Sequence, residues 1–295
     1  MSKKLKASLL LLSAGFFFVL MAVFIVKSGD LPTMQKSFFR NAIAAIFALT
    51  LLLKQRPIVT LDRKKWIALL IRSTFGTIGL VCNFYAIDHL LLADASIIGR
   101  LSPFFSIFFS YLILKESVTV KHIIFVLIAF SGSLLVIKPQ MNFVYLFPYL
   151  IALLGAIGAG GAYTMVRKLG NAGVNGTFVV FFFSTFSCIS NLPFALATYT
   201  PMSLEQLFYL LLTGLSACAA QFSLTIAYYN APARDISILE YGQLIFSAFF
   251  GFVLFSQIPD ATSILGYIIT AAGAVGMFIY TKHLSAKKEK QLKKV

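Results

Sequence analysis

Asp94-Ala95-Ser96-Ile97 begins a stretch of sequence that recurs 141 residues later as Asp235-Ile236-Ser237-Ile238. The same offset aligns Gly132 with Gly273, and ten of the 44 positions from 94 to 137 are identical without a gap. An internal repeat of this length indicates a chain built from two similar halves. The apolar segments around the repeat determine what each half forms.

The composition is that of a membrane protein. Of the 295 residues, 59% are apolar and only 12% are charged, and the mean hydropathy is +0.88. A soluble domain has about 25% charged residues. A disordered chain would be poor in aromatic residues, whereas this chain has 31 Phe. Both classes are therefore excluded.

The apolar residues gather into ten runs long enough to cross a bilayer. A spanning helix needs about 20 mostly apolar residues, because the hydrocarbon core is about 30 Å thick. The linkers between the runs are short, and most of them contain Gly or Pro. We predict the spans Ala7–Lys27, Gln35–Lys54, Trp66–Asp88, Leu92–Leu114, Thr119–Lys138, Val144–Arg167, Gly176–Thr198, Gln206–Tyr229, Ala233–Gln257 and Thr262–His283.

Ten spans in two similar halves predict an all-α integral membrane protein with a 5+5 inverted repeat. Because five is odd, consecutive halves must cross the membrane in opposite directions. We expect residues 1–140 to form the first five-helix repeat, residues 141–284 the second, inverted repeat, and residues 285–295 a basic cytoplasmic tail. Transporters often have this architecture, with the substrate site near mid-membrane where the repeats meet.

Positive charges gather on one side of the predicted membrane. Of 25 Lys and Arg residues, 19 fall in segments on the side of both termini, three on the opposite side and three inside spans. The positive-inside rule then makes both termini cytoplasmic and the protein a multi-pass protein of the inner or cytoplasmic membrane. This orientation explains the net charge of +15. We therefore expect membrane lipids, and not nucleic acid, as partners.

Several short motifs are spread along the chain. They are Lys36-Ser37-Phe38-Phe39-Arg40-Asn41, Phe84-Tyr85-Ala86, Ala93-Asp94-Ala95-Ser96, Leu101-Ser102-Pro103-Phe104, Leu114-Lys115-Glu116, Ile238-Leu239-Glu240-Tyr241 and Gln257-Ile258-Pro259. These motifs resemble those of a known family, the EamA branch of the drug/metabolite transporter (DMT) superfamily. Their order resembles that of the family over nearly the whole chain. The resemblance implies ten helices, a central cavity and the movement of small organic metabolites, often outward.

Charged residues inside the spans are the first candidates for a substrate site, because each costs about 2.5–3.5 kcal/mol at a helix centre. Arg40 and Arg72 lie near the ends of their spans, where snorkelling interface anchors or packing partners are the favoured interpretation; Arg40 is also kept as a substrate-binding candidate. Arg100 and Glu240 lie deeper, in equivalent spans. We expect them to flank one central polar site, either paired or holding a zwitterionic or polar ligand. The alternative is a fixed ion pair that locks one conformation.

Other polar residues share helical stripes with these charges. Arg72, Gly76, Gly79 and Asn83 recur at steps of four, three and four. Small residues on such stripes usually serve close helix packing. Amides facing lipid are unfavourable, so three amides and two aromatic side chains complete the predicted substrate site, with packing or lipid contact as the alternative for the aromatics: Asn83, Gln221, Gln243, Tyr163 and Tyr241. Pro103 should bend the fourth span beside Arg100.

These features favour a secondary active transporter that moves a small organic metabolite, such as an amino-acid-like, amine or drug-like solute, by alternating access. Export is the favoured direction, and import by the same fold is an alternative. Glu240 is the proton-coupling candidate, because a carboxylate released from Arg100 in a desolvated site would gain a proton. The oligomeric state stays open, with a homodimer as one arrangement.

No residue pattern indicates an enzyme, a cofactor or a metal site. His89, His122 and His283 lie far apart, the three cysteines fall within spans, and there is no glycine-rich phosphate loop. Two other classes are kept as alternatives. One is an integral-membrane enzyme acting on a lipid-linked substrate, and the other is a channel with passive flux.

Overall fold

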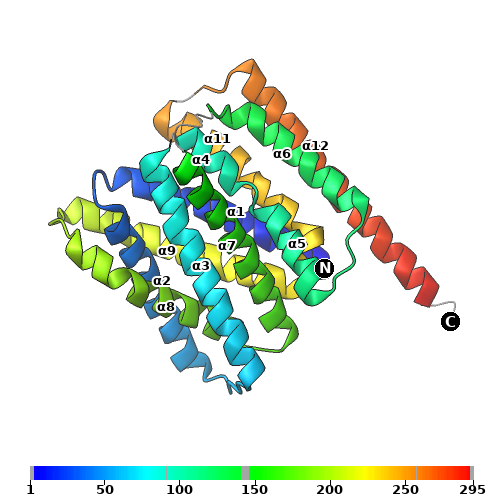
Figure 1. Ribbon diagram of the computed structural model, residues 1–295, viewed down its shortest axis with the longest axis horizontal. Coiled ribbons are helices and arrows are strands. Elements are labelled where there is room, and N and C mark those ends of the chain that lie inside the picture. Colours follow the sequence, from blue (N-terminus) through cyan, green and yellow to red (C-terminus); the bar gives the residue numbers. More distant parts are fainter. Residues whose placement is uncertain (1–2, 91, 141–145, 257, 293–295) are drawn as a thin grey trace.

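The computed structural model describes residues 3–90, 92–140, 146–256 and 258–292, and in this part of the chain helices are joined by loops, without strands (Figure 1). Within it, ten helical segments are long and apolar enough to cross a membrane. Eight of them are single helices: α1 (Lys3–Lys27), α2 (Thr33–Gln55), α3 (Arg63–His89), α6 (Val120–Ile137), α7 (Leu146–Asn171), α8 (Gly176–Ala197), α9 (Leu204–Asn230) and α12 (Ala261–Leu292).

The other two crossings, the fourth and the ninth, are interrupted. The fourth consists of α4 (Leu92–Gly99) and α5 (Ser102–Leu114). The ninth consists of α10 (Ala233–Ile236), the 3₁₀ helix η2 (Ser237–Tyr241) and α11 (Gly242–Phe255). The ten predicted spans are thus present among the described residues, and two of them are interrupted in their first half.

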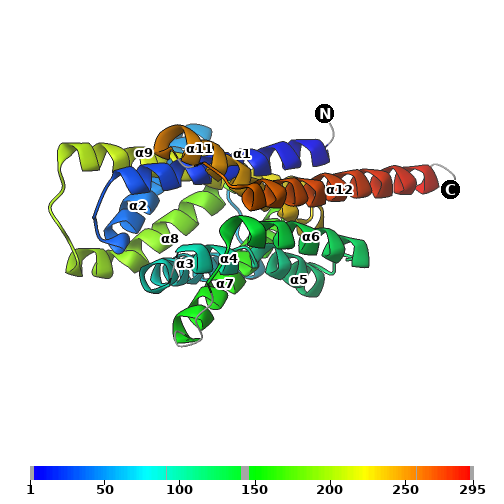
Figure 2. The ribbon, with the colours of Figure 1, turned by 90° about the horizontal axis from the view of Figure 1, so that it is seen from above.

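The packing of the helices follows a two-fold exchange of the halves. Helix α1 packs against α9, and its counterpart α7 packs against α3, the counterpart of α9. The pairs α2–α8 and α6–α12 each join equivalent helices, and they lie at opposite edges of the bundle (Figures 1 and 2). Equivalent residues 141 positions apart also touch directly, because the Thr270 hydroxyl donates to the Ala129 carbonyl at 3.3 Å. Such a contact places both residues near the axis that relates the halves.

Glycine allows α6 and α12 to approach each other at this edge. A Cβ on Gly132 would lie 2.6 Å from the Gly266 carbonyl oxygen, closer than real side chains come. In the middle of the bundle, a Cβ on Gly158 of α7 would lie 2.8 Å from the Phe75 carbonyl oxygen of α3. Small residues at helix contacts are what bilayer proteins use, since lipid supplies no hydrophobic force between helices.

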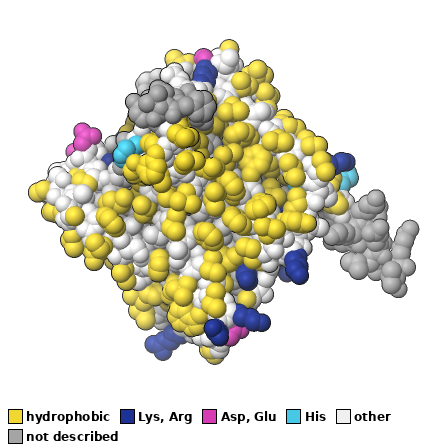
Figure 3. Space-filling model, in the orientation of Figure 1, with side chains coloured by type: hydrophobic (Ala, Val, Ile, Leu, Met, Phe, Trp, Pro, Cys, Tyr) yellow, Lys and Arg dark blue, Asp and Glu magenta, His cyan; other side chains and the backbone are white. Residues whose placement is uncertain are grey.

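The outer surface is apolar across the middle of the molecule. In Figure 3, apolar side chains cover most of the visible face and Lys and Arg lie at its margins. Large side chains such as Phe108, Leu127 and Ile268 are more than half exposed, as lipid-facing residues would be. Helix α12 continues past His283 to Leu292, so the predicted tail begins as helix. Residues 141–145, where the second repeat is predicted to begin, lie outside the described residues. Gln257 of the family-like motif lies outside them as well.

Candidate functional site

The break in the fourth crossing is local in origin. Helix α4 ends at Gly99, and α5 begins at Ser102 with Pro103 in its first turn. Proline has no N–H to donate to the carbonyl four residues before it, so the α4 helix cannot run on through this position. The main-chain N–H groups of Arg100 and Leu101 donate to carbonyls three residues earlier, those of Ile97 and Ile98, at 3.1 and 2.9 Å. The bend predicted beside Arg100 is therefore present.

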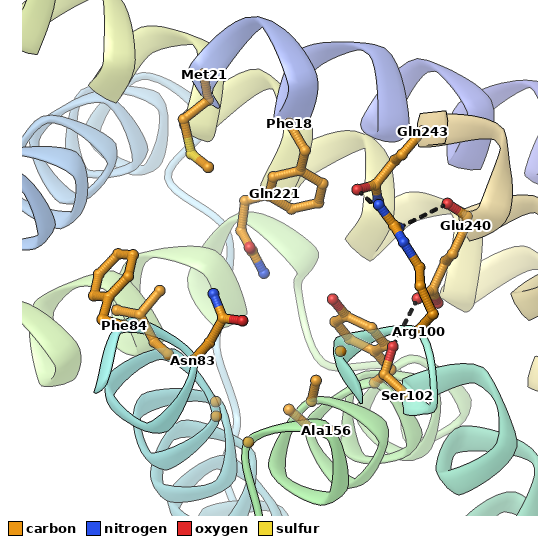
Figure 4. A pocket seen from close by; sticks show the side chains of 18 of the residues that line it. Phe18, Met21, Asn83, Phe84, Arg100, Ser102, Ala156, Gln221, Glu240 and Gln243 are labelled. Carbon is orange, nitrogen blue, oxygen red and sulfur yellow. Dashed lines mark hydrogen bonds between the residues drawn. The ribbon is translucent and has the colours of Figure 1, made fainter. Parts of the chain in front are cut away.

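The break in the ninth crossing faces this one, and side chains join the two. The Tyr241 hydroxyl donates to the Arg100 carbonyl at 2.8 Å. The Arg100 guanidinium donates to the Glu240 carbonyl at 3.4 Å and to the Gln243 side-chain oxygen at 3.3 Å (Figure 4). Residues 100 and 241 are equivalent under the 141-residue offset. Their contact therefore places the joined breaks at the two-fold axis.

The Glu240 carboxylate is held by hydroxyl groups. Tyr228 donates to one oxygen at 2.6 Å and Ser102 to the other at 3.3 Å. None of the ion pairs within 4.0 Å among the described residues joins Glu240 to Arg100. The interpretation of a fixed Arg100–Glu240 ion pair is therefore wrong. In the tight 3₁₀ turn, the main-chain carbonyl of Glu240 accepts from Arg100, while the carboxylate accepts from the buried Tyr228 hydroxyl.

Arg40 and Arg72 are packing partners inside the bundle, as one of the two interpretations has it, and the other interpretation, anchors at the membrane interface, is wrong. Only 6% of Arg40 and 2% of Arg72 is exposed. The Arg40 guanidinium donates to the Asn41 side chain at 2.9 Å. The Arg72 guanidinium lies over the Phe183 ring, 3.7 Å from its centre. Both arginines point into the bundle because neighbours from α2 and α8 hold them there.

A cavity of about 400 Å³ lies beside the joined breaks. Seven of the eight predicted site residues line it: Arg40, Asn83, Arg100, Tyr163, Gln221, Glu240 and Gln243. The eighth, Tyr241, is fully buried behind Arg100, to which it is bonded. In Figure 4 the amides of Asn83 and Gln221 lie across the cavity from Arg100.

The predicted site did not include several wall residues. The stripe Arg72, Gly76, Gly79 and Asn83 lines the cavity as a whole, so its helical spacing was the signal that could have added Arg72. Aromatic and sulfur-containing wall residues, Phe18, Met21, Phe84 and Phe183, had no such signal among 31 Phe.

The cavity opens at one end of the bundle. Ala22 near the end of α1 and Asn83 near the end of α3 line it and are exposed. At this end, Lys138 and Asp260 pair between α6 and the start of α12. The hydrogen bonds from Lys138, Ser263 and Thr262 lower the pKa of the exposed Asp260 carboxyl. This pair joins the ends of two helices at the edge of the bundle, and neither residue lines the cavity.

Ionic contacts close the opposite end. Asp235 of α10 lies 2.6 Å from the Lys4 ammonium, 3.5 Å from Arg234 and 3.6 Å from the His122 ring. One carboxylate thus contacts side chains from helices of both halves.

A second closing contact lies beside it. Arg167 of α7 pairs with Glu116 at 3.3 Å and donates to the carbonyls of Tyr228 and Tyr229 at 3.2 and 2.8 Å. Together the two clusters seal the end of the bundle where the chain begins.

A ten-helix membrane bundle with a polar cavity between two broken, symmetry-related helices defines the class of helical membrane transporters. The sequence model of the EamA-like transporter family matches residues 5–138 and again residues 146–279. The chain belongs to this family.

Named relatives agree with this assignment. The chain is 32% identical to the pseudopaline exporter CntI of Pseudomonas aeruginosa over 271 residues, 91% of this chain and 94% of the relative. It is 23% identical to solute carrier family 35 member G1 of Homo sapiens, covering 94% of this chain and 80% of that protein. A solved structure titled "Crystal structure of protein" superposes with a TM-score of 0.82 at 16% identity, over 94% of this chain and 98% of that one, which shows the same fold.

The bond from Tyr241 to the helix break should contribute measurably to stability. Tyr241→Phe leaves the buried Arg100 carbonyl without this donor, a loss of about 1–3 kcal/mol. Tyr111→Phe is the matched control, because Tyr111 is 57% exposed on α5. The half-life of the monodisperse protein in detergent at raised temperature should fall for Tyr241→Phe alone. Equal half-lives for the two variants would contradict this role.

Proposed function

We propose that this protein is a secondary active transporter that moves a small organic metabolite across the cytoplasmic membrane through the central cavity. The observation that carries the proposal is the polar cavity at the joined helix breaks. Buried charges are costly in a bilayer and are retained where they contact a solute or a pathway. The family and the named relatives are transporters, so the membrane-enzyme alternative is set aside.

Alternating access follows from one end being open while the other is held by ion pairs. The halves 1–140 and 141–284 serve as the two repeat units, in keeping with the two family matches. Because the repeats are inverted, exchanging their conformations would open the closed end and close the open one. At the open end, the carboxylate of Asp94, the equivalent of Asp235, accepts from the Tyr149 hydroxyl at 2.5 Å and from the main-chain N–H of Gln140 at 2.6 Å.

Export is the proposed direction. With both termini cytoplasmic, as the distribution of Lys and Arg favours, the open end of the cavity faces outward and the ionic contacts close the cytoplasmic end. One relative at 32% identity is named as an exporter. An importer of the same fold is the alternative, since inverted symmetry has no preferred direction.

Arg100 provides the direct test of transport. Cells producing the protein should release at least one metabolite that control cells retain, as measured by mass spectrometry of medium and cell extract. Arg100→Gln removes the charge bonded to the opposing helix break and should reduce that release about tenfold or more. The matched control is Arg63→Gln, which changes an exposed arginine at the start of α3. Release that is equal for Arg100→Gln and the unchanged protein would overturn the role of this site.

The ion pairs at the closed end should set the balance between the two states. Asp235→Asn removes the carboxylate that lies beside Lys4, Arg234 and the His122 ring, and should favour opening of that end. A loss of about 1–2 kcal/mol shifts a two-state equilibrium about five- to thirtyfold. A membrane-impermeant reagent added outside should therefore label Asn83→Cys more slowly.

Asp260→Asn is the control, because it breaks the exposed pair with Lys138 at the other end and exposed pairs contribute little. Labelling that Asp235→Asn leaves unchanged or accelerates would contradict the gate.

Glu240 is proposed as the coupling site for a proton. Its carboxylate is bonded to two neutral hydroxyls and not to Arg100, so gain of a proton leaves no arginine partner unpaired. In proteoliposomes, counterflow of the released metabolite should respond to an imposed pH gradient in the unchanged protein. Glu240→Gln should exchange the metabolite without that response. A gradient effect that survives in Glu240→Gln, or its absence in the unchanged protein, would remove the proton from the mechanism.

A further inference from the structure

The cavity wall carries more positive than negative charge. Arg40, Arg72 and Arg100 line it, whereas Glu240 is the single acidic residue among the described residues of the wall. Arginine keeps its proton in proteins, because its unperturbed pKa lies above 12. The wall therefore has an excess of two positive charges when Glu240 is ionised and three when it is protonated. Unbalanced charge inside a membrane is costly and calls for a counter-charge.

Arg72 lines this cavity and has side-chain donors without hydrogen-bond partners among the described residues. Its side chain is 2% exposed, and its Nε and Nη1 atoms have no hydrogen-bond partner among the described residues. One face of the guanidinium is covered by the Phe183 ring. Gly76 makes room for this stack, since a Cβ there would lie 2.7 Å from the same ring. The guanidinium is thus held in one orientation with its edge unsatisfied.

The bonds of Arg100 are long, and the partners of Arg40 are neutral. Arg100 donates to neutral oxygens at 3.3 and 3.4 Å, and its buried Nε atom has no partner in the described part of the chain. Arg40 donates to the Asn41 amide oxygen and, at 3.4 Å, to the Met21 sulfur. Guanidinium groups bind carboxylates through two parallel, charge-assisted bonds, which are stronger than these contacts. A carboxylate ligand would displace them at little cost.

We propose that the cavity binds an organic anion with at least two carboxylate groups. Two carboxylates balance the excess charge, and the arginines on α2, α3 and at the α4 break supply donors from different sides. The amides of Asn83 and Gln221 and the rings of Phe18 and Phe84 line the same cavity (Figure 4) and would contact the carbon skeleton. A volume of about 400 Å³ suits a small metabolite. Transport of this anion rests on the proposed function, whereas its binding does not.

The electrostatic part of the proposal can be tested without knowing the natural substrate. In a variant with Cys82, Cys188 and Cys218 replaced by Ala, Asn83→Cys places one exposed thiol on the cavity wall. A methanethiosulfonate with a sulfonate group should react about tenfold or more faster than one with a trimethylammonium group, after correction by their rates with 2-mercaptoethanol. Arg72→Gln, and separately Arg40→Gln, should lower this ratio severalfold, and the exposed Arg63→Gln should not.

Binding is tested on the purified, detergent-solubilised protein by thermal shift with succinate and citrate at millimolar concentration. The neutral succinamide and the cation choline are the comparison ligands, at equal ionic strength. Succinate or citrate should raise the unfolding midpoint, and Arg72→Gln or Arg40→Gln should abolish the shift while Arg63→Gln keeps it. The second arginine variant covers the case in which one of the two fails to fold.

Three results would overturn the proposal. They are a labelling ratio that does not favour the anionic reagent, stabilisation by the neutral or cationic ligand alone, and the absence of a shift with either carboxylate. These outcomes are distinct from failure of the proposed function. If anions bind but no metabolite is released, the transport function is contradicted and the anion site is not. If only a cation is released, the anion site is contradicted and the transport function is not.

Discussion

Main-chain groups that leave a helix inside a bilayer must find partners within the protein, because no water is available to them in the hydrocarbon core. Two crossings of this chain are interrupted, and each supplies hydrogen-bond donors to main-chain carbonyls of the other. Tyr241 of one break donates to the carbonyl of Arg100 at the other, and the Arg100 guanidinium reaches back to the Glu240 carbonyl. The cavity lies where this exchange occurs, since irregular backbone is tolerated only beside protein or a polar space. The inverted repeat brings equivalent residues to a common axis and makes the exchange possible.

The fold was predictable because its signals are spread over many residues. Ten apolar runs and the 141-residue offset between Asp94 and Asp235 predict the number of helices and their division, and a two-fold pairing such as α6 with α12 follows. Pro103 predicts the first break from local chemistry. The second break has no proline and was not predicted.

The site was predictable in membership and less so in detail. Depth along a helix identified Arg100 and Glu240, and the cost of amides in lipid identified Asn83, Gln221 and Gln243. Depth misled for Arg40 and Arg72, because distance from a helix end does not reveal which side faces the bundle. The partner of the Glu240 carboxylate also escaped prediction. Tyr228 lies 12 residues earlier on α9, and its contact depends on how the 3₁₀ turn rotates the acid.

The account depends on the two ends of the bundle opening in turn, which spin-label distance measurements in liposomes test most directly. One pair of labels belongs at the closed end, at the exposed residues Ile58 and Val120, and the other at the open end, at Tyr199 and Ile258. The account predicts two separations at each end, with populations that change in opposite directions when conditions favour one state. A single, unchanging separation at both ends, or ends that widen together, would contradict it.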